Sequence, residues 1–592
     1  MTRRETDVGD RLLIGVMVVA LAVAAASAFG AGFTTSIAGI RVSTLTLFRP
    51  VVIAGAAALL AVWRSRHRQR QLAHMWRATQ RHAMTITVCM AAFGFAIAMR
   101  TSLFEARASD QYGYVSQAAL WAKGNLTVEQ PLAAAAPWPD ATWTFAPLGY
   151  RPGLRAATIV PTYPPGLPLV MACFLTLFGS FGAFLAVPLL GSLVVIATFC
   201  LGRRIGGAAC GLLAAMFVMT SPIFLFQLRQ PMSDVPVTAW WLVATLLVAN
   251  PTAAYRFGGG LAASAAILTR PNLVPLAAVL GGFVLFASSS RLPTRLRNAS
   301  AFAAGVVPGC VGLALINRAL YGSPFESGYG STAELFKFEY LGANLSTYPR
   351  WLIETETPFI ALAVLAPWLI RTSMSWLFVA SSAIVFACYA FYLPFDNWTY
   401  LRFLLPAISL LLILSSAVVL HVAHHLPSHT TRWLVAAVCL ALMAWRWDSA
   451  GMQPPGPNDR RFAVVGEFVL NELPPNAILL SMQHSGSVRY YSGRLSLRWD
   501  LLPPEWLDRS LTFLRSKGYH PLLLLEDWEQ PRFTQRFAAH TRVGALDWQP
   551  LASYPGEIRT DIFDPADQTR SSAPHLTRTI GVGLADPAAS QR

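Results

Sequence analysis

Charged residues are scarce in this sequence, and lysine is almost missing. Charged residues make up 13% of the 592 residues, whereas hydrophobic residues make up 54%. A soluble globular domain has about 25% charged residues, and this much apolar surface cannot be buried in one aqueous core. The formal net charge is nevertheless +16, because arginine supplies nearly all cations; the only lysines are Lys123, Lys337 and Lys517. The composition therefore excludes an ordinary soluble protein.

Cysteine pairs and the signature motifs of soluble enzymes are also missing. All seven cysteines fall in apolar stretches and none forms a CxxC pair, so nothing indicates a disulfide framework or a zinc site. The sequence has no P-loop, no GxSxG, no HExxH and no GxGxxG in a strand–helix context. These absences argue against a soluble nucleotide-binding site.

Long apolar runs, in contrast, are abundant. Runs of about 17–25 residues are typical of membrane-spanning helices. Spans are predicted near 11–33, 45–63, 83–103, 182–201, 208–226, 235–250, 255–270, 272–289, 299–318, 357–370, 374–393, 401–420 and 431–447. The first apolar run is about twenty residues long, longer than in a usual signal peptide, so we expect a retained anchor. The predicted fold is an α-helical polytopic membrane protein with about thirteen transmembrane helices.

Arginine-rich segments between the spans set the predicted orientation. The strongest is 64–82 (RSRHRQRQLAHMWRATQRH), and others lie at 202–204, at 291–297 and around Arg371. Basic loops of this kind stay in the cytoplasm, so we expect a cytoplasmic N-terminus in a bacterial inner membrane. They also explain the basic charge without a nucleic acid partner. All of them fall on one side only if the apolar segment 166–179 lies on the outer face instead of crossing.

This orientation divides the chain into four parts. Residues 1–82 hold two spans and the basic loop, and residues 83–447 form the main transmembrane domain with an outer loop at 104–165. Residues 450–575 alternate helical and strand-like patterns, as in PPEWLDRSLTFLRSKG followed by HPLLLLED, and predict a small periplasmic α/β domain. Residues 576–592 are polar and are expected to be disordered.

Asp110 is the first candidate for chemistry, in an outer loop of a chain with few acids. It opens the stretch DQYGYVSQAALWAKG, in which Tyr114, Ala118 and Trp121 recur at helical spacing. An Asp at a helix start is a normal N-cap, whereas an acid on the outer face can also be the working base of an active site. From the residues alone, both interpretations stay open.

Two further motifs carry charge on the same side. In RQPMSD, Ser233 or Asp234 can cap the next helix, or Asp234 can pair with Arg229. Arg270 lies between two apolar runs in ILTRPN and is costly there unless it reaches water or a partner. It either extends to the interface or holds an anionic head group, because the arginine fork matches phosphate oxygens.

Aromatic residues accompany the charges at the outer ends of later spans. FDNWTYLRFLLPA places Asp396 and Arg402 beside Trp and Tyr, and NRALYGSPFESGYGS adds Glu326 in a loop rich in Gly and Tyr. An interfacial aromatic belt explains most of these rings, but rings beside an acid also suit stacking on sugars. Carboxylates and arginines on one outer face suit chemistry on a lipid-linked phosphate donor.

The order of these motifs resembles that of the GT-C membrane glycosyltransferases, which include protein O-mannosyltransferases and aminoarabinose transferases of lipid A. The resemblance rests on DQYGY, YPPGLPL, a span ending in GRR, RQPMSD, LTRP and YLRFLLP, and covers roughly residues 83–420. It implies an inverting hexosyl- or pentosyltransferase whose catalytic domain is 83–447. Such an enzyme moves a sugar from a polyprenyl-phosphate donor in the membrane to an extracytoplasmic glycan, lipid or protein acceptor.

The resemblance also implies roles for the matching residues. Asp110 is then the catalytic base, Asp234 binds the acceptor or a metal, and Arg270 and Arg402 bind the donor phosphate, where charge develops on the leaving group. Further candidates for contact with substrate are Tyr112, Tyr163, Arg229, Glu326 and Asp396. The first motif has one acid instead of an Asp-Glu pair, which argues against metal dependence. No cofactor is certain, and a divalent metal stays an alternative.

Two other functions are compatible with a multispan chain. A lipid or solute transporter needs charged residues near mid-membrane and often has inverted repeats, whereas these charges gather at one face of a sequence without internal repeats. The second alternative is a non-catalytic membrane protein with the same fold, whose outer domain binds a partner.

Overall fold

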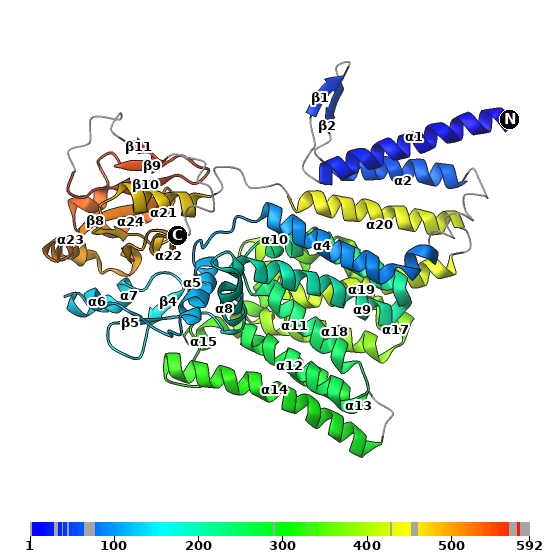
Figure 1. Cartoon of the computed structure of the whole chain (residues 1–592), viewed down its shortest axis with the longest axis horizontal. Coiled ribbons are helices and arrows are strands. Elements are labelled where there is room, and N and C mark those ends of the chain that lie inside the picture. Colours follow the sequence, from blue (N-terminus) through cyan, green and yellow to red (C-terminus); the bar gives the residue numbers. More distant parts are fainter. Residues whose placement is uncertain are drawn as a thin grey trace.

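The computed structural model combines a bundle of long helices with a small α/β domain at one end of the bundle (Figure 1). It describes residues 3–28, 34–37, 40–43, 46–63, 77–287, 291–330, 332–426, 429–451, 460–567 and 577–580. Most of the basic segment 64–82 and residues 581–592 of the predicted tail lie outside the described residues.

The helices of the bundle follow the predicted apolar runs, and a helix occurs at each position predicted for a span. Helices and closed barrels are the structures that satisfy backbone polar groups in lipid. The elements are α1 (Arg3–Ala28), α2 (Phe48–Trp63), α4 (Ala83–Thr101), α8 (Gly166–Phe178), α9 (Gly182–Met219), α10 (Pro222–Leu228), α11 (Asp234–Val248), α12 (Ala253–Thr269), α13 (Pro275–Phe286), α14 (Leu292–Tyr321), α16 (Leu341–Glu356), η3 (Pro358–Leu365), α17 (Ala366–Ile370), α18 (Ser373–Ala390), η4 (Trp398–Leu404), α19 (Leu405–His425) and α20 (His429–Ser449).

Judged by helix length and composition, fewer of the described helices could cross a membrane than the sequence predicts. Among the described residues, five helices could cross a membrane, or six if Phe338–Glu356 and Pro358–Ile370, bent by 110°, count as one span. Other apolar helices, including α11 and α13, are 10–17 residues long, shorter than the roughly 20 residues that a span needs. The thirteen spans are therefore not confirmed and stay a prediction.

Helix α9 is two helices joined by a sharp turn after the GRR motif. Helical geometry breaks at Gly206 and Gly207, and φ is 79° at Gly207, a conformation that favours glycine. A Cβ on Gly211 would lie 2.5 Å from the Phe199 carbonyl oxygen and 3.1 Å from the Arg203 nitrogen. The chain therefore doubles back here, as the two spans predicted on either side of GRR require.

The first outer loop folds into its own small layer at the end of the bundle. It holds α5 (Asp110–Ala122), α6 (Pro131–Ala135), α7 (Ala141–Thr144), β3 (Val128–Glu129), β4 (Tyr150–Pro152) and β5 (Thr158–Pro161). The strands form an antiparallel sheet in the order β3-β5-β4. Helix α5 packs against α8, which places the loop against the bundle.

Residues 460–567 and 577–580 belong to the α/β domain (Figure 1). Its sheet has the order β11-β9-β10-β8-β6-β7, and β6 runs parallel to β7 and β8. Its elements are α21 (Arg461–Glu472), β6 (Ala477–Leu480), α22 (Ser485–Ser492), β7 (Leu495–Leu497), α23 (Leu507–Ser516), β8 (His520–Glu526), α24 (Glu529–Phe537), β9 (Ala552–Tyr554), β10 (Thr560–Phe563) and β11 (Arg578–Thr579). Strand β11 lies inside the tail 576–592 that the sequence predicts to be disordered. Its two residues are ordered by pairing with β9.

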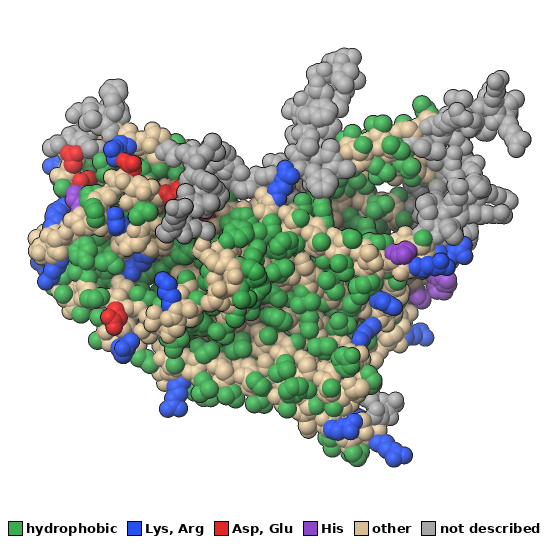
Figure 2. Space-filling model, in the orientation of Figure 1, with side chains coloured by type: hydrophobic (Ala, Val, Ile, Leu, Met, Phe, Trp, Pro, Cys, Tyr) green, Lys and Arg blue, Asp and Glu red, His purple; other side chains and the backbone are tan. Residues whose placement is uncertain are grey.

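The α/β domain shares a hydrophobic core with the first outer loop. Trp138 and Phe145 of the loop are buried in one cluster with Leu480, Leu497 and Phe533 of the domain. On the face shown in Figure 2, acidic side chains lie over this domain and the adjoining loop, whereas most histidines lie at the opposite end of the bundle. The loop and the domain thus form one cap on the bundle.

Candidate active site

A cavity of about 800 Å³ lies where the first outer loop meets the helical bundle. Charged side chains line it together with a larger number of aromatic and aliphatic ones. The lining comes from the start of α5, the turn before α8, the start of α11, the end of α12, α14, α18 and η4. The fold thereby gathers most of the motifs that the sequence singled out.

Asp110, the first residue of α5, presents its carboxylate to this cavity. Tyr163 donates its hydroxyl to Oδ1 over 2.8 Å, and Arg402 Nη2 donates to Oδ2 over 3.0 Å. Ser109 holds the N-cap position and makes no side-chain capping bond. With 34% of the Asp110 side chain exposed, its carboxylate is oriented by two neighbours and still accessible. Capping is therefore not what this acid does.

Tyr163 stays a hydrogen-bond donor in this arrangement. Burial, and then the nearby Asp110 carboxylate, raises the pKa of the Tyr163 phenol well above its ordinary value. The protonated phenol also lies 2.8 Å from the Ser109 hydroxyl. The turn that precedes α8 thus contributes a fixed donor to Asp110.

A second ion pair joins the start of α11 to the end of α12. Arg270 Nη2 lies 2.6 Å from Asp234 Oδ1, and the Asp234 side chain is fully buried. Arg270 also donates to the Ser233 hydroxyl over 3.1 Å and to the Tyr389 hydroxyl over 2.8 Å. The predicted alternatives at this motif, a side-chain cap or a pair with Arg229, are both replaced by this contact with Arg270.

The two ion pairs are neighbours. The Phe403 ring centre is 4.9 Å from the guanidinium carbon of Arg270 and 5.2 Å from that of Arg402. Tyr114 of α5 donates its hydroxyl to Ser233 over 2.9 Å. One aromatic ring and one tyrosine hydroxyl therefore connect both pairs in a single cluster.

Two buried polar atoms of this cluster make no hydrogen bond to any residue that the structure describes. Among the described residues, the buried atoms Arg402 Nε and Asp234 Oδ2 have no hydrogen-bond partner. Buried polar groups in native proteins are nearly always satisfied. Arg402 lines the cavity, so its donor indicates a polar ligand group or water there; Asp234 is fully buried outside the lining.

Five predicted site residues lie outside the cavity lining: Asp234, which is buried in its pair with Arg270, and four that lie elsewhere. Tyr112 is on another face of α5, with its ring 5.8 Å from that of Tyr150. Arg229 Nη1 points to the Gly451 carbonyl, 3.5 Å away. Glu326 pairs with Arg151 over 3.2 Å, and Asp396 is exposed; the structure does not bring these four residues to the site.

Several site residues escaped the sequence interpretation. Tyr114 was placed on a helix face but given no role, although it lies one turn after Asp110. Ser233 was considered only as a cap. Tyr389 is buried inside the apolar run of α18, where a tyrosine gives no local sign that its hydroxyl meets Arg270.

The two acids of this cluster do not fit a divalent cation. Among the described residues, no group of three or more His, Cys, Asp or Glu side chains could hold a metal ion. Asp110 and Asp234 are each paired with an arginine, and arginine competes with a cation for the carboxylate. The chemistry below is therefore derived without a metal.

Comparison by sequence points to one family. Residues 162–314 match the sequence model of the dolichyl-phosphate-mannose-protein mannosyltransferases. No curated protein matches the chain.

Comparison by structure finds membrane glycosyltransferases at low sequence identity. ArnT from Cupriavidus metallidurans in the apo state is 14% identical, with 82% of this chain and 98% of that chain covered and a TM-score of 0.51. The structure of the same protein bound to undecaprenyl phosphate is 12% identical, with 76% and 94% covered and a TM-score of 0.48. Archaeal oligosaccharyltransferase AglB from Archaeoglobus fulgidus, in complex with an inhibitory peptide and a dolichol-phosphate, is 11% identical, with 84% and 75% covered and a TM-score of 0.47. The predicted resemblance is thereby confirmed: the chain has the GT-C fold of membrane glycosyltransferases, and its residues 162–314 match one of their families.

Proposed function

We propose that the chain is an inverting glycosyltransferase of the bacterial inner membrane. It moves a hexosyl or pentosyl group from a polyprenyl-phosphate donor to a glycan, lipid or protein acceptor on the periplasmic side. The observation that carries this proposal is the cavity that Asp110, Arg270 and Arg402 line together, with the Asp110 carboxylate paired to Arg402.

Two comparisons support the donor class. The matching family is described by dolichyl-phosphate-mannose, and ArnT, whose apo structure has the same fold, is also known bound to undecaprenyl phosphate. Dolichyl and undecaprenyl phosphates are both phosphates on long isoprenoid chains. A polyprenyl phosphate is therefore the carrier that we assign to this chain.

In the proposed reaction, Asp110 is the general base. It accepts the proton of an acceptor hydroxyl or amine while the acceptor oxygen or nitrogen bonds to the anomeric carbon of the sugar. The bond from that carbon to the phosphate oxygen breaks, and its electron pair leaves with the phosphate. Attack opposite the leaving group inverts the configuration. Tyr163 and Arg402 each hold one carboxylate oxygen of Asp110, which orients the base.

The two arginines are suited to the leaving phosphate. Charge develops on the phosphate as the bond breaks, and fixed cations near it stabilise that charge. The unpaired Nε of Arg402 can donate to a phosphate oxygen. Asp234 holds Arg270 in place through their ion pair. The role toward acceptor or metal that the resemblance gives to Asp234 stays a prediction.

The apolar part of the lining suits an isoprenoid chain. Helix α14 contributes Leu313 and Ile316 to the cavity. Only 17% of the most apolar 18-residue stretch of α14 is buried, so this helix borders the surrounding lipid. We therefore infer that the donor enters from the membrane along α14.

Mutation of Asp110 tests this function. We expect that a strain lacking the gene loses one glycosylated lipid, glycan or protein, that the wild-type chain restores it, and that Asp110→Asn fails to restore it at equal protein level. Asp396→Asn is the matched control, because Asp396 is an exposed acid outside the cavity lining. Restoration by Asp110→Asn would remove Asp110 as the base, and an unchanged glycan profile in the deletion strain would overturn the transferase proposal.

Reporter fusions test the proposed topology. A fusion at about residue 75 is expected to report the cytoplasm and one at about residue 455 the periplasm. The same compartment for both would place the cavity on the wrong side for a periplasmic acceptor.

A further inference from the structure

The α/β domain meets the first outer loop through the edge of its sheet where ligands usually bind. In open α/β sheets, that place is the crevice beyond the carboxyl ends of the parallel strands. Here the residues that follow β6 and β7 contact the loop instead. Leu148 N–H donates to the Ser485 hydroxyl over 3.1 Å, and Arg498 N–H donates to the Thr144 carbonyl over 2.6 Å.

Arg489 of α22 reinforces this contact. Its Nη2 donates to the Phe145 carbonyl over 2.7 Å, and its Nη1 donates to Gln130 Oε1 over 3.2 Å. Its Nε donates to the Ser496 hydroxyl inside the domain over 2.8 Å. One guanidinium group therefore binds both the loop and the domain, and the chain's own loop occupies the place of a ligand.

The same domain holds the chain just before Asp110. Ala106 N–H donates to the Tyr491 hydroxyl over 2.9 Å. One residue earlier, Ala463 N–H of α21 donates to Glu105 Oε1 over 3.1 Å. Two elements of the domain, α21 and α22, thus fix the segment that leads into α5.

The domain also touches α5 just after Asp110. The ring of Tyr112 lies directly on Gly486 of α22, and a Cβ on Gly486 would approach Tyr112 Cδ1 to 2.2 Å. A distance below 3 Å forces the ring or the helix to move. Only glycine allows this close approach of α22 to α5.

The backbone before α5 has an uncommon conformation. Phe104 and Ala108 have φ angles of 52° and 49°, in the left-handed region that non-glycine residues seldom adopt. Such conformations persist where the surrounding structure determines them. Glu105 and Ala106, which lie between these two residues, are the ones that the α/β domain binds.

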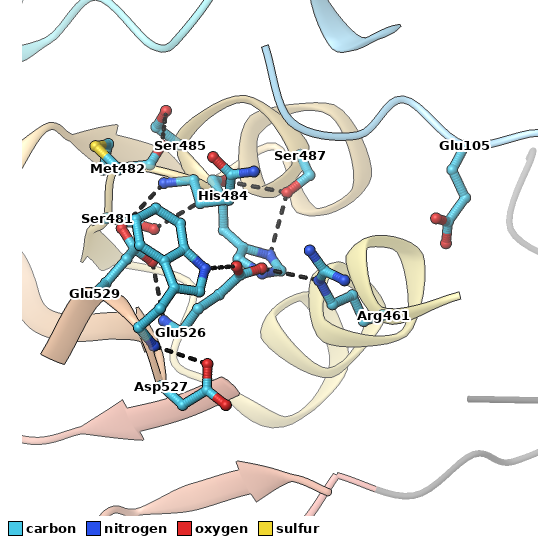
Figure 3. Close-up of polar contacts among 12 residues, drawn as sticks. Glu105, Arg461, Ser481, Met482, His484, Ser485, Ser487, Glu526, Asp527 and Glu529 are labelled. Atoms are coloured by element: carbon cyan, nitrogen blue, oxygen red, sulfur yellow. Dashed lines mark hydrogen bonds and ion pairs between the residues drawn. The ribbon is translucent and has the colours of Figure 1, made fainter. Parts of the chain in front are cut away.

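A buried polar network makes the two holding helices one unit (Figure 3). Arg461 Nε of α21 lies 2.8 Å from Glu526 Oε1, and His484 Nε2 lies 3.1 Å from the same oxygen. Glu529 accepts backbone N–H groups of Gln483 and Glu526. Because α21 and the start of α22 share one carboxylate, their contacts with the loop are held in a fixed relation.

We propose that the α/β domain positions Asp110 for the transfer reaction, with Tyr491 and Gly486 as the positioning residues. This inference rests on the proposed function, because it assumes that Asp110 is the base. Tyr491 and Gly486 act through the entry segment and helix α5. Displacing α5 moves the carboxylate away from Tyr163 and Arg402 and from the reacting centre, where misplacement by about 1 Å can cost roughly 100-fold in rate.

Two variants of the full chain test this positioning role. Gly486→Ala adds a methyl group against the Tyr112 ring, and Tyr491→Phe removes the hydroxyl that accepts from Ala106. Tyr490→Phe is the matched control, because it removes a hydroxyl from the neighbouring residue of α22. In the double variant Gly486→Ala with Tyr112→Leu, the smaller side chain makes room for the new methyl group.

Hydrogen exchange provides the readout that is independent of activity. In purified protein, Gly486→Ala and Tyr491→Phe are expected to speed amide exchange at least fivefold in residues 104–115. Exchange in β8 (His520–Glu526) should stay at the wild-type rate, which separates positioning from unfolding of the domain. Tyr490→Phe should change neither segment.

Activity and ligand binding complete the test. In the complemented deletion strain, Gly486→Ala and Tyr491→Phe should lower product formation at least tenfold, and the double variant should recover part of it. Binding of undecaprenyl phosphate, used as the probe, should change less than twofold, because Arg270 belongs to the bundle. The positioning role would be overturned if amide exchange in residues 104–115 were unchanged, or if it were faster while product formation stayed at the wild-type level. Faster exchange of β8 in both variants would also overturn it.

The two proposals fail in different ways. If Asp110→Asn retains product formation, the assignment of the base fails, whatever the exchange data show. If Asp110→Asn is inactive while Gly486→Ala and Tyr491→Phe form product at the wild-type rate, the transferase proposal stands and the positioning role fails.

Discussion

The guanidinium group of Arg402 lies 3.0 Å from the Asp110 carboxylate, although 292 positions separate the two residues in the chain. Asp110 opens the first helix of the outer loop, and Arg402 lies in η4, directly before α19. The site is therefore complete only when the first outer loop is docked on the end of the bundle.

Removal of Arg402 should lower product formation. Arg402→Ala takes one of the two partners from Asp110 and the unpaired donor from the cavity, and a hydrogen bond to a charged group is worth about 1.5–3 kcal/mol. We expect product formation to fall about 10- to 100-fold. Arg402→Lys should be intermediate, because lysine keeps the charge but not the fork. Product levels in the complemented strain measure this, and a wild-type level in Arg402→Ala would contradict the role.

Loss of the Tyr163 hydroxyl should have a smaller effect of the same kind. Tyr163→Phe keeps the ring and removes the donor to Asp110, so we expect a decrease of about tenfold in product formation at equal protein level. Tyr340→Phe, outside the cavity lining, is the control. Equal activity of the two variants would show that Asp110 needs no orientation by Tyr163.

The sequence predicted the helices well because long apolar runs are a strong signal, and it predicted four of the cavity residues because their motifs recur in a fixed order. It could not predict partners. For Asp234 the sequence offered a helix cap or a pair with Arg229, five positions away, but Asp234 pairs with Arg270 across the contact between α11 and α12. Helix packing decides such pairs, and local spacing does not record it.

The link between the two ends of the chain was equally hidden. The contact of Tyr491 with Ala106 joins residues 385 positions apart, and the motif SMQHSGSVRYYSGR carries no sign of it. Gly486 is an example: in the sequence it is one glycine among forty-one, and only the neighbouring Tyr112 ring shows why a side chain does not fit there.

A buried ion pair at the bend between α16 and η3 should be important for stability. Glu356 and Arg446 of α20 form this pair with both side chains fully buried, and Ser221 also bonds to Glu356. Glu356→Gln leaves a buried arginine without its counter-charge, which typically costs about 3–5 kcal/mol. We expect a clearly lower temperature of thermal inactivation in detergent. Glu354→Gln removes an exposed pair from the same helix and should change stability by less than about 1 kcal/mol.

Two buried acids should make the stability of the α/β domain and of its contact with the segment before α5 depend on pH. Burial raises the pKa of Glu105 to about 7 and that of Glu529 to about 7, from 4.5. Each carboxyl group binds its proton more tightly in the folded state, so its contribution is full below pH 4.5 and is lost as the pH rises through about 7. Each acid accounts for a change on the order of 3 kcal/mol across this window.

The comparison of variants isolates this effect, because other groups titrate nearby. Burial lowers the pKa of His484, so the contribution of this residue to stability has the opposite pH dependence. It is present above pH 6.5 and is lost as the pH falls below that value. The positive charges of Arg107, Arg460 and Arg461 act on Glu105 and favour its ionised form. Glu105→Gln should therefore reduce only the loss of stability between pH 4.5 and 7. The measurement is the rate of amide exchange in residues 104–115 at several pH values, corrected for the intrinsic exchange rate. Glu505→Gln, at an exposed position of the same domain, should leave the slope unchanged; an equal slope in Glu105→Gln and the wild type would show that Glu105 does not titrate with this contact.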